Sequence, residues 1–225
     1  GTLNVTAIYM PGPYSSNDSE TLAKKLAENL GIKLLEFPIS DMYAVAAKHV
    51  DQAFGKSEFG ITHENIQARL RGLALMAYSN RENSMVLGTT NKSELAVGYG
   101  TLYGDLIGGI MPIADLLKGE VYQLCEQYNS ESEIIPDKIL TRAPTAELRE
   151  NQTDQDSLPP YDELDAAVRR LVEGFHSPKT ATEKKILSMM MKSEFKRWQA
   201  PPVLKVSDHA FGRGRRFPVA HRAGF

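Results

Sequence analysis

The sequence predicts an α/β protein in which a parallel sheet is flanked by helices. Short, continuously apolar runs, typical of strands buried on both faces, alternate with longer segments whose apolar residues recur every three or four positions. Strands that alternate with helices along the chain indicate a doubly wound fold. In such folds ligands bind beyond the carboxyl ends of the strands, so the segments that follow the strands are the first candidates for a site.

Apolar runs predict the strands of this sheet. The first run stops at Pro11, so its carboxyl end is Met10, and the other two lead to Ile39 and Gly88. The predicted strands span residues 4–10 (NVTAIYM), 32–39 (IKLLEFPI) and 84–89 (SMVLGT).

Helical periodicity accounts for most of the remaining chain. The first helix carries Leu22 and Leu30 among apolar residues at four-residue steps, and Gly31 follows as a stop signal. Asp18 and Ser19 are predicted as N-caps, because their side chains can accept a hydrogen bond from the first turn. The predicted helices span residues 19–30, 41–54, 63–79, 115–128, 161–173 and 180–197.

The length of the chain suits one domain. Its 225 residues and 42% hydrophobic content allow one sizeable core, so residues 1–225 are assigned to a single domain with a C-terminal tail over 200–225. The tail has no clear period, and either a solvated terminus or a functional role fits its arginines. The polar segment 149–160, which ends in proline, is predicted as a loop. The tail arginines are Arg213, Arg215, Arg216 and Arg222.

Charge and cysteine content argue against several classes of protein. A formal net charge of −2 gives no reason to expect nucleic acid or a membrane surface as a partner. Cys125 is the only cysteine, so a disulfide framework within the chain is impossible and a reducing compartment is expected. No apolar run is long enough to span a membrane, and no charged-then-apolar leader opens the chain. We therefore expect a cytoplasmic protein.

The densest cluster of polar groups follows the third predicted strand, in segments 88–94 and 98–105. Hydroxyl, amide, ammonium and carboxylate groups crowd together there, which is unfavourable unless a ligand pairs with them. Glu94 and Asp105 offer the hard oxygen ligands that Mg²⁺ prefers. The glycines between them would let the backbone approach a ligand closely. These features favour a functional site over an ordinary loop.

Two stretches in the first half allow a functional and a structural interpretation. At the end of the first strand, exposed backbone groups could bond a purine edge and hydroxyls such as that of Ser15 could meet phosphate; an ordinary turn is the alternative. In segment 64–72, Asn65 and Arg69 share one line of a helix. A guanidinium fork suits an anionic substrate, but a surface helix with charge pairs would look the same.

Two stretches in the second half are equally open. Thr145 could cap a helix or take part in a site. Two acids and a Ser-Leu-Pro-Pro turn in segment 154–162 could form a mobile cover or a solvated loop. Lys196 and Arg197 end a predicted helix, where they could either complement the helix dipole or bind an anion.

Taken in order, these stretches resemble the NAD synthetase family. The resemblance covers most of residues 3–217 and is closer to the glutamine-dependent subclass than to the shorter ammonia-only enzymes. It implies an adenine nucleotide α-hydrolase-like (Rossmann-like) fold and a homodimer with deamido-NAD near the subunit interface. The motifs are YMPGPYSS (9–16), ENIQAR (64–69), TTNKSE (89–94), VGYGTLYGD (97–105), RAPTAELR (142–149), DQDSLPPYD (154–162) and EFKR (194–197).

The resemblance implies an ATP-dependent amidation in two steps. The nicotinate carboxylate of deamido-NAD attacks the α-phosphate of ATP, which gives an adenylated intermediate and pyrophosphate. Ammonia then displaces AMP and leaves the carboxamide of NAD. Positioning and charge neutralisation are expected to supply most of the catalysis.

The resemblance also implies roles for individual residues. Lys118 and Thr145 fall where the family places catalytic phosphate contacts to ATP, and Glu94 corresponds to the Mg²⁺ ligand that also borders deamido-NAD. Leu102 stands where the ammonia-only branch has a lysine, so that contact is absent. The ATP contacts implied are Thr89, Lys118, Thr145, Met10 and Ser15; the deamido-NAD contacts implied are Asn65, Arg69, Glu94, Tyr99, Gly100, Thr101, Leu102 and Lys196.

Two departures from the family pattern limit these expectations. Nothing matches the family's Ser-Gly-Gly-x-Asp-Ser phosphate loop, which precedes the strand that begins here near Asn4, so residues 1–225 are read as N-terminally incomplete and expected to bind ATP poorly alone. Cys125 lies in a predicted helix without a neighbouring histidine and is read as a core residue, not a glutaminase nucleophile. Ammonia would then arrive free or from a glutaminase domain outside this sequence. The alternatives are another ATP-pyrophosphatase amidotransferase, such as a GMP-synthetase-like protein, and a non-catalytic nucleotide-binding fragment.

Overall fold

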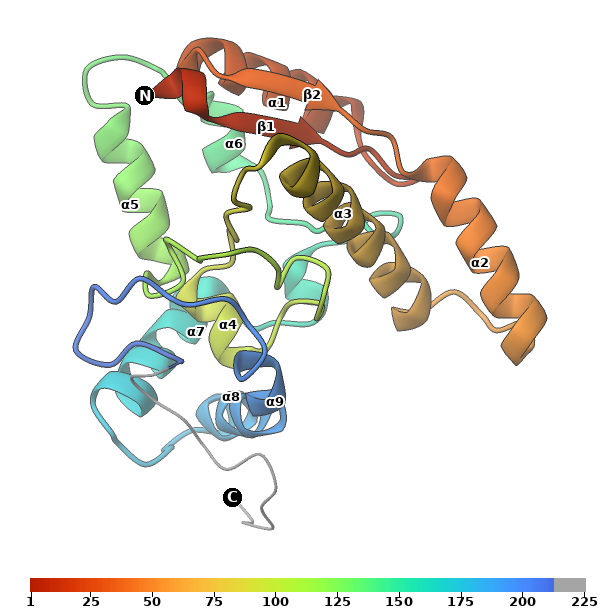
Figure 1. The fold of residues 1–225 in the computed structure, drawn as a ribbon. Helices are drawn as coiled ribbons and strands as arrows, with labels where there is room; N and C mark the ends of the chain where they lie inside the picture. Colours follow the sequence, from red (N-terminus) through yellow and green to blue (C-terminus); the bar gives the residue numbers. More distant parts are fainter. Residues whose placement is uncertain (213–225) are drawn as a thin grey trace.

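The computed structural model describes residues 1–212 and confirms the α/β fold class (Figure 1). Two parallel strands, β1 (Thr6–Tyr9) and β2 (Lys33–Glu36), pair in a register that runs from Thr6 opposite Lys33 to Tyr9 opposite Glu36. Helix α1 (Asn17–Leu30) connects them and packs against both. This unit is the strand–helix–strand crossover that parallel pairing requires.

The ends of α1 follow from local chemistry. Ser16 is the N-cap, and its hydroxyl accepts a hydrogen bond of 3.2 Å from the Ser19 amide. The predicted caps Asp18 and Ser19 were wrong, because both lie inside the first turn. At the other end Gly31 adopts a left-handed φ of 62°, and its N–H closes the last turn.

Helices α2 (Ser40–Phe54) and α3 (Ile61–Glu82) pack against each other beside this unit. Tyr78 of α3 bonds Thr6 of β1 through their hydroxyl groups at 3.3 Å. Near the middle of α3, a Cβ on Gly72 would lie 2.5 Å from the Tyr103 carbonyl oxygen. Only glycine therefore lets α3 approach the loop that follows α4 so closely.

The third predicted strand, 84–89, was wrong as a strand. Within residues 1–212 its backbone makes one isolated bridge, between Leu87 and Ile110. The Gly109 amide bonds the Val86 carbonyl and the Gly88 amide bonds the Ile110 carbonyl, both at 2.9 Å. The apolar run is extended as expected, but two ladder hydrogen bonds do not make a strand.

The second half of the chain holds the main hydrophobic core. Leu95 of α4 packs there with Leu164 and Val168 of α7, Ile186 of α8 and Phe211 near the end of the described chain. Short 3-10 turns lie at Thr2–Asn4 and Asp154–Asp156, and α7 continues into a π-helical turn at Arg169–Glu173. The helices of this half are α4 (Lys92–Val97), α5 (Lys118–Tyr128), α6 (Asp137–Thr141), α7 (Tyr161–Val168), α8 (Ala181–Lys192) and α9 (Glu194–Arg197).

Two predicted helix boundaries were wrong. The helix predicted over 115–128 begins at Lys118, because the Asp115 side chain accepts bonds from distant amides instead of capping this helix. The helix predicted over 180–197 divides at Ser193 into α8 and α9. The Ser193 hydroxyl bonds the Met189 carbonyl at 2.8 Å, and the positive-φ Gly98 at the end of α4 packs directly against Ser193.

The first part of the predicted tail is anchored to the core. Val203 forms a parallel bridge with Met111, and Asp115 accepts hydrogen bonds from the Val206 and Ser207 amides. A fully solvated terminus is therefore wrong for residues 203–209. The four tail arginines, Arg213, Arg215, Arg216 and Arg222, lie outside the described residues.

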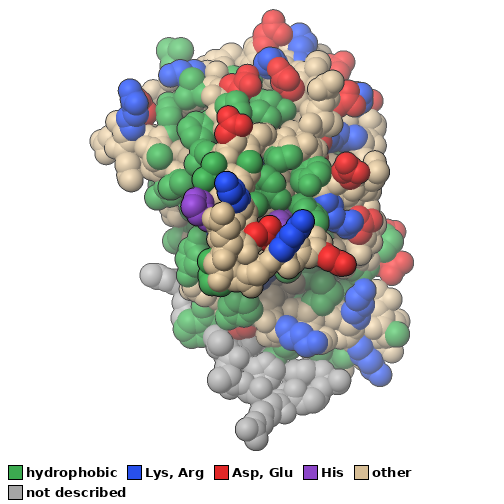
Figure 2. All heavy atoms as spheres, turned by 90° about the vertical axis from the view of Figure 1, so that its right-hand side faces the viewer, with side chains coloured by type: hydrophobic (Ala, Val, Ile, Leu, Met, Phe, Trp, Pro, Cys, Tyr) green, Lys and Arg blue, Asp and Glu red, His purple; other side chains and the backbone are tan. Residues whose placement is uncertain are grey.

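Charged groups of both signs lie on one face of the molecule (Figure 2). On the face that carries α2 and the start of α3, acidic and basic side chains are interspersed with hydrophobic ones (Figure 2). Phe54 and Ile61 are among the exposed hydrophobic residues of these two helices. Searching residues 1–212 finds no helix with the length and apolar character needed to cross a membrane.

Candidate active site

A cavity of about 820 Å³ lies between α3, α4, α5 and the loops that join them. It gathers side chains that are far apart in the sequence, from Met10 near the first strand to Lys196 on α9. The sequence-predicted residues on its wall are Met10, Asn65, Thr89, Glu94, Tyr99, Gly100, Thr101, Lys118, Thr145 and Lys196.

An ion pair between Glu94 and Lys118 stands in the cavity wall. Glu94 is in the first turn of α4 and Lys118 opens α5; Lys118 Nζ lies 3.0 Å from Glu94 Oε1. The other Glu94 oxygen accepts the Asn91 amide, while Asn91 caps α4. Burial alone would lower the pKa of Lys118, but the adjacent Glu94 carboxylate outweighs it and the pKa is raised. Lys118 is therefore a fixed cation beside a carboxylate.

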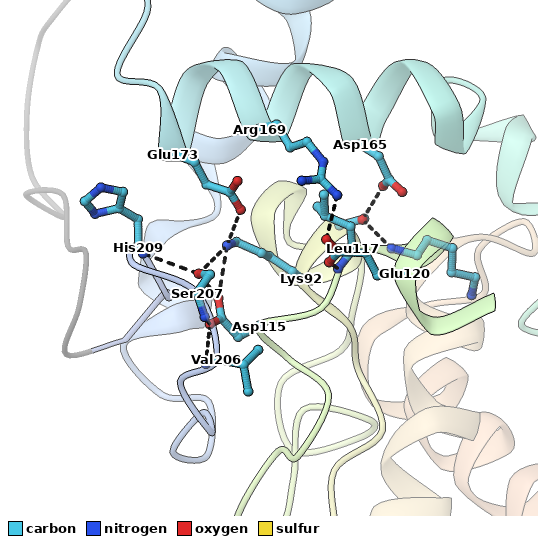
Figure 3. Close-up of polar contacts among 12 residues, drawn as sticks. Lys92, Asp115, Leu117, Glu120, Asp165, Arg169, Glu173, Val206, Ser207 and His209 are labelled. Carbon is cyan, nitrogen blue, oxygen red and sulfur yellow. Dashed lines mark hydrogen bonds and ion pairs between the residues drawn. The ribbon is translucent and has the colours of Figure 1, made fainter. Parts of the chain in front are cut away.

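The rest of the NKSE motif faces away from the cavity. Lys92 is fully buried and pairs with Asp115 at 3.0 Å and Glu173 at 2.7 Å; it also donates to Ser207 Oγ at 3.0 Å. Figure 3 shows its ammonium group enclosed by these three side chains. Ser93 is also fully buried. Lys92 and Ser93 of the motif are thus buried in the interior, whereas Glu94 lines the cavity.

A second part of the wall is built from segment 98–105 and its contacts. The Thr101 hydroxyl donates to Asn65 Oδ1 at 2.7 Å, and the Thr101 amide donates to Asp105 Oδ1 at 2.8 Å. Lys196 Nζ donates to the carbonyls of Gly98 at 2.8 Å and Gly100 at 2.7 Å. These contacts hold a polar turn against α3 and α9.

The charges in this turn are perturbed by burial. Burial lowers the pKa of Lys196, with the Asp105 carboxylate acting in the opposite direction. Burial also raises the pKa of Asp105, although hydrogen bonds from backbone amides partly offset it. The two groups form an electrostatically coupled pair at the cavity wall.

Two predicted substrate contacts do not line the cavity. Arg69 is exposed, and its Nε donates to the Leu102 carbonyl at 3.2 Å. Leu102 itself lies beside the wall residue Thr101 but contributes no lining of its own. The structure therefore brings Asn65 into the cavity and leaves Arg69 and Leu102 at its margin.

A smaller cavity of about 400 Å³ adjoins the first and contains Ser15. It lies between α1 and the two strands, and Met10, Arg71 and Thr145 line both cavities. Thr145 does not cap a helix; its hydroxyl accepts the Glu147 amide at 3.1 Å in a loop. The expected ATP contacts Met10, Ser15 and Thr145 therefore lie together where the two cavities meet.

Two residues of the candidate site, Arg71 and Asp154, were not predicted individually. Arg71 donates through Nε to the Met10 carbonyl at 3.0 Å and lines both cavities. Asp154 is buried and accepts the hydroxyls of Tyr99 at 3.1 Å and Tyr161 at 2.7 Å. Burial, reinforced by Asp154, raises the pKa of both tyrosines. The signal for Asp154 was the DQDSLPPYD motif, which is anchored here and not simply solvated.

The assignment of Cys125 to the core was wrong. The cysteine is only partly buried and lines the larger cavity. Cys125 lies in a helix as predicted, but it is on the side of α5 that faces the cavity. Burial raises the pKa of the thiol, so it stays protonated near neutral pH.

The fit of a divalent cation depends on Glu94. Residues 1–212 contain no group of three or more His, Cys, Asp or Glu side chains arranged to hold a metal. Mg²⁺ at a nucleotide site is usually held by one or two carboxylates together with substrate phosphates and water. Glu94, beside Lys118, fits that arrangement. Asp105, the other predicted oxygen ligand, also lines the cavity, but its Oδ1 already accepts the Thr101 amide and burial raises its pKa.

Comparison with known proteins agrees with the geometry. Residues 1–200 match the NAD synthase family. The glutamine-dependent NAD(+) synthetase of Synechocystis is 47% identical over 98% of this chain and 41% of its own length. The chain thus spans about two fifths of that relative.

Solved structures give the same fold. The glutamine-dependent NAD+ synthetase of Acinetobacter baumannii, in complex with ADP, matches with a TM-score of 0.60 and 33% identity, over 95% of this chain and 40% of that one. The NMN synthetase of Francisella tularensis matches with a TM-score of 0.73 and 29% identity, over 85% and 75%. Because residues 1–200 of its 225 residues match the family, the chain belongs to the NAD synthase family.

Proposed function

We propose that this chain is the synthetase part of an enzyme that converts deamido-NAD to NAD with ATP and ammonia. The observation that carries the proposal is the composition of the larger cavity. Thr89 and Lys118, expected on the ATP side, line the same cavity as Asn65 and Lys196, expected on the deamido-NAD side, and as Glu94, expected to border deamido-NAD and to bind Mg²⁺. A cavity that holds both sets can bring a carboxylate and a phosphate together.

In the proposed first step, a nicotinate carboxylate oxygen bonds to the α-phosphorus of ATP as the bond to the β-phosphate oxygen breaks. Lys118 would offset the charge that builds on the phosphates. Thr145, at the junction of the cavities, would bind the triphosphate from the opposite side, with Met10 and Ser15 nearer the nucleoside. Pyrophosphate leaves, and the adenylate is a far better leaving group than oxide.

In the proposed second step, ammonia attacks the activated carbonyl carbon, AMP departs with the former carboxylate oxygen, and one proton is released. Lys196 and the turn of Tyr99, Gly100 and Thr101 would hold the dinucleotide, with Asn65 opposite. Arg69 and Leu102 would contact parts of the substrate that extend beyond the cavity. Much of the rate gain would come from fixing the two reactants in place.

Glu94 would be the protein ligand of Mg²⁺, which supplies charge neutralisation on the phosphates when bound. Lys118 shares this carboxylate, so the cation and the lysine would act on the same phosphate group. Ca²⁺ is a useful probe of this site, because it also binds oxygen ligands but accepts a different coordination geometry from Mg²⁺.

The ammonia source and the assembly are part of the proposal. The curated relatives are named glutamine-dependent, and this chain aligns with 41% of the length of the one from Synechocystis. A glutaminase domain elsewhere in the protein would supply ammonia, and free ammonia would bypass it. A homodimer would cover Phe195 and Trp198, which flank Lys196 and are 43% and 51% exposed. Sedimentation velocity tests the dimer.

The test is an assay of the protein with deamido-NAD, Mg-ATP and ammonium, in which NAD, AMP and pyrophosphate are measured together. The proposal expects equal amounts of the three products and no AMP when deamido-NAD is omitted. AMP without NAD, or no turnover by a folded protein that binds neither nucleotide, would contradict it and favour a non-catalytic fragment. A GMP-synthetase-like reaction is not favoured, because the family match is to NAD synthase.

The size of the pyridine substrate is a separate question. One structural neighbour is an NMN synthetase, so nicotinate mononucleotide should be assayed beside deamido-NAD. The family match to NAD synthase favours the dinucleotide. A higher kcat/KM for the mononucleotide would overturn that choice without affecting the amidation chemistry.

A further inference from the structure

Asp165, on the core side of α7, makes hydrogen bonds that reach the ion pair in the cavity wall. Its Oδ2 accepts the Gly119 amide at 2.8 Å, and its Oδ1 accepts the hydroxyl of Ser93. The oxygen of that same hydroxyl accepts the Lys118 amide at 2.9 Å. One carboxylate thus ties the residue before Glu94 to the first two residues of α5.

The start of α5 has several supports, and two come from α7 and the π-helical turn that continues it. The Leu117 amide is capped by Glu120 at 2.7 Å, and Arg169 holds Glu120 at 2.6 Å. Asp165 and Arg169 point from the same helix toward Leu117 and Glu120 (Figure 3). A carboxylate also suits the positive end of the α5 dipole. The exposed Arg169–Glu120 pair adds little, whereas the contacts of Asp165 involve the fully buried Ser93.

The distances in this network fix the backbone from which the cavity ion pair projects. Glu94 follows Ser93 directly, and Lys118 is itself one of the donors. The Glu94–Lys118 separation of 3.0 Å therefore depends on how Ser93 and Gly119 are held together. A displacement of about 1 Å at reacting groups can lower a rate about 100-fold.

We propose that Asp165 is a positioning residue, which acts through Ser93 and the first turn of α5 to hold Lys118 against Glu94. This inference rests on the proposed function of that ion pair in the synthetase reaction. Asp165 does not line either cavity, so its effect is transmitted and not direct.

The substitution Asp165→Asn separates this role from simple packing. Both oxygens of Asp165 act as acceptors, for one hydroxyl and one amide, whereas asparagine offers one acceptor oxygen and an NH₂ group of similar shape. The oxygen can keep the Gly119 amide, but the Ser93 hydroxyl can no longer donate to a carboxylate: it must turn and accept from the NH₂ group instead, so the charge-assisted bond is lost while the volume stays the same. Glu163→Gln is the matched control: it lies on the same helix, is exposed, and removes the same charge.

The first test measures steady-state kinetics with saturating ammonium. Asp165→Asn should lower kcat about 10- to 100-fold while KM for deamido-NAD stays within about twofold, because the group moved is the phosphate-side lysine. Glu163→Gln should leave both constants unchanged. A folded Asp165→Asn protein with wild-type kcat, or with a change confined to KM, would overturn the inference.

The second test asks whether the effect passes through Lys118. In a Lys118→Ala background, adding Asp165→Asn should lower the remaining rate by less than about twofold, since residues that act as one unit are not additive. A repeat of the full loss in that background would show that Asp165 acts elsewhere.

A third readout does not need activity. Hydrogen–deuterium exchange of the Lys118 and Gly119 amides should become faster in Asp165→Asn, and the amides of α8 should not change. Unchanged protection at residues 118–119 would refute the positioning role even if the wild-type protein makes no NAD. Absence of NAD synthesis by the full-length wild-type protein, with protection lost in the variant, would instead sink the proposed function and leave the network established.

Discussion

Replacing Lys92 with methionine probes the buried charge cluster behind α4. The change keeps most of the length of the side chain and removes an ammonium group bonded to Asp115, Glu173 and Ser207. The Asp115 side chain is fully buried and would lose its opposite charge. Removing one partner of a buried pair costs about 3–5 kcal/mol.

The expected loss lies near the lower end of that range. Asp115 keeps hydrogen bonds from the Val206 amide at 2.8 Å, from the Ser207 amide at 2.6 Å and from the Ser207 hydroxyl at 2.9 Å. These donors stabilise the carboxylate that remains, so we expect a loss of about 3 kcal/mol. With a urea m-value of about 3 kcal/mol/M, the unfolding midpoint should fall by about 1 M.

Urea unfolding followed by circular dichroism is the assay, and two further variants sharpen it. Lys92→Met with Asp115→Asn removes the unpaired charge and should recover more than half of the loss. Lys24→Met, which breaks the exposed pair with Glu20, should change the free energy of unfolding by less than about 0.5 kcal/mol. A midpoint shift below about 0.3 M for Lys92→Met, or a double variant no more stable than the single one, would refute the reasoning.

The pH dependence of the same pair has a defined sign. Burial alone would raise the pKa of Asp115, but the Ser207 and Val206 amides and Lys92 outweigh it, and the pKa lies below its usual 3.8. The stability that the ionised carboxylate contributes is therefore present above pH 3.8 and lost as the pH falls through the lowered value. The difference between the wild type and Lys92→Met should shrink over that acidic range.

Further predictions concern the cavity. Cys125 should react slowly with iodoacetamide at neutral pH and faster as the pH rises through its raised pKa, and a ligand in the cavity should protect it. Mass spectrometry measures the rate of labelling. Rapid labelling at pH 7 would contradict the burial of the thiol. The affinity for deamido-NAD should fall at alkaline pH, because the pKa of Lys196 lies below its usual 10.5 and the side chain loses its charge there. In a calorimetric titration, Lys196→Arg should make this decline less steep. An equally steep decline in the variant would exclude Lys196 as its cause. Gly72→Ala should lower the free energy of unfolding by about 1–2 kcal/mol, since the added Cβ meets the Tyr103 carbonyl; a calorimetric melting temperature at or above that of the wild type would show that the loop yields freely.

Local patterns in the sequence were good guides to regular structure. The four-residue leucine steps and Gly31 predicted α1 to within two residues at its start, because helix propensity and the stop signal act within a few positions. The run 84–89 failed as a strand because strand formation needs a neighbour along its length, and periodicity carries no information about that neighbour. Pairing is a property of the fold and not of the segment.

The site was predictable as a set of motifs and less so as a set of orientations. Lys92 and Glu94 are two positions apart in one polar motif, yet only Glu94 lines the cavity, because α4 points the two side chains in different directions. Cys125 shows the same limit on α5. Asp165 could not have been found at all from its local sequence, since its partners lie 46 and 72 residues away and its role follows from their geometry.

The docked segment that ends near Ser207 also constrains how the protein is made. Ser207 lies 115 residues after Lys92, and 92 after Asp115. At about 5–20 residues per second, a ribosome would need roughly 6–23 s to synthesise the chain between Lys92 and Ser207. During that interval the lysine cannot acquire its full set of partners, so α4 must wait in a partly solvated state. Completion of this half of the core is therefore tied to the synthesis of Ser207, and a chain that stalls before this residue would expose an unfinished core to chaperones and proteases.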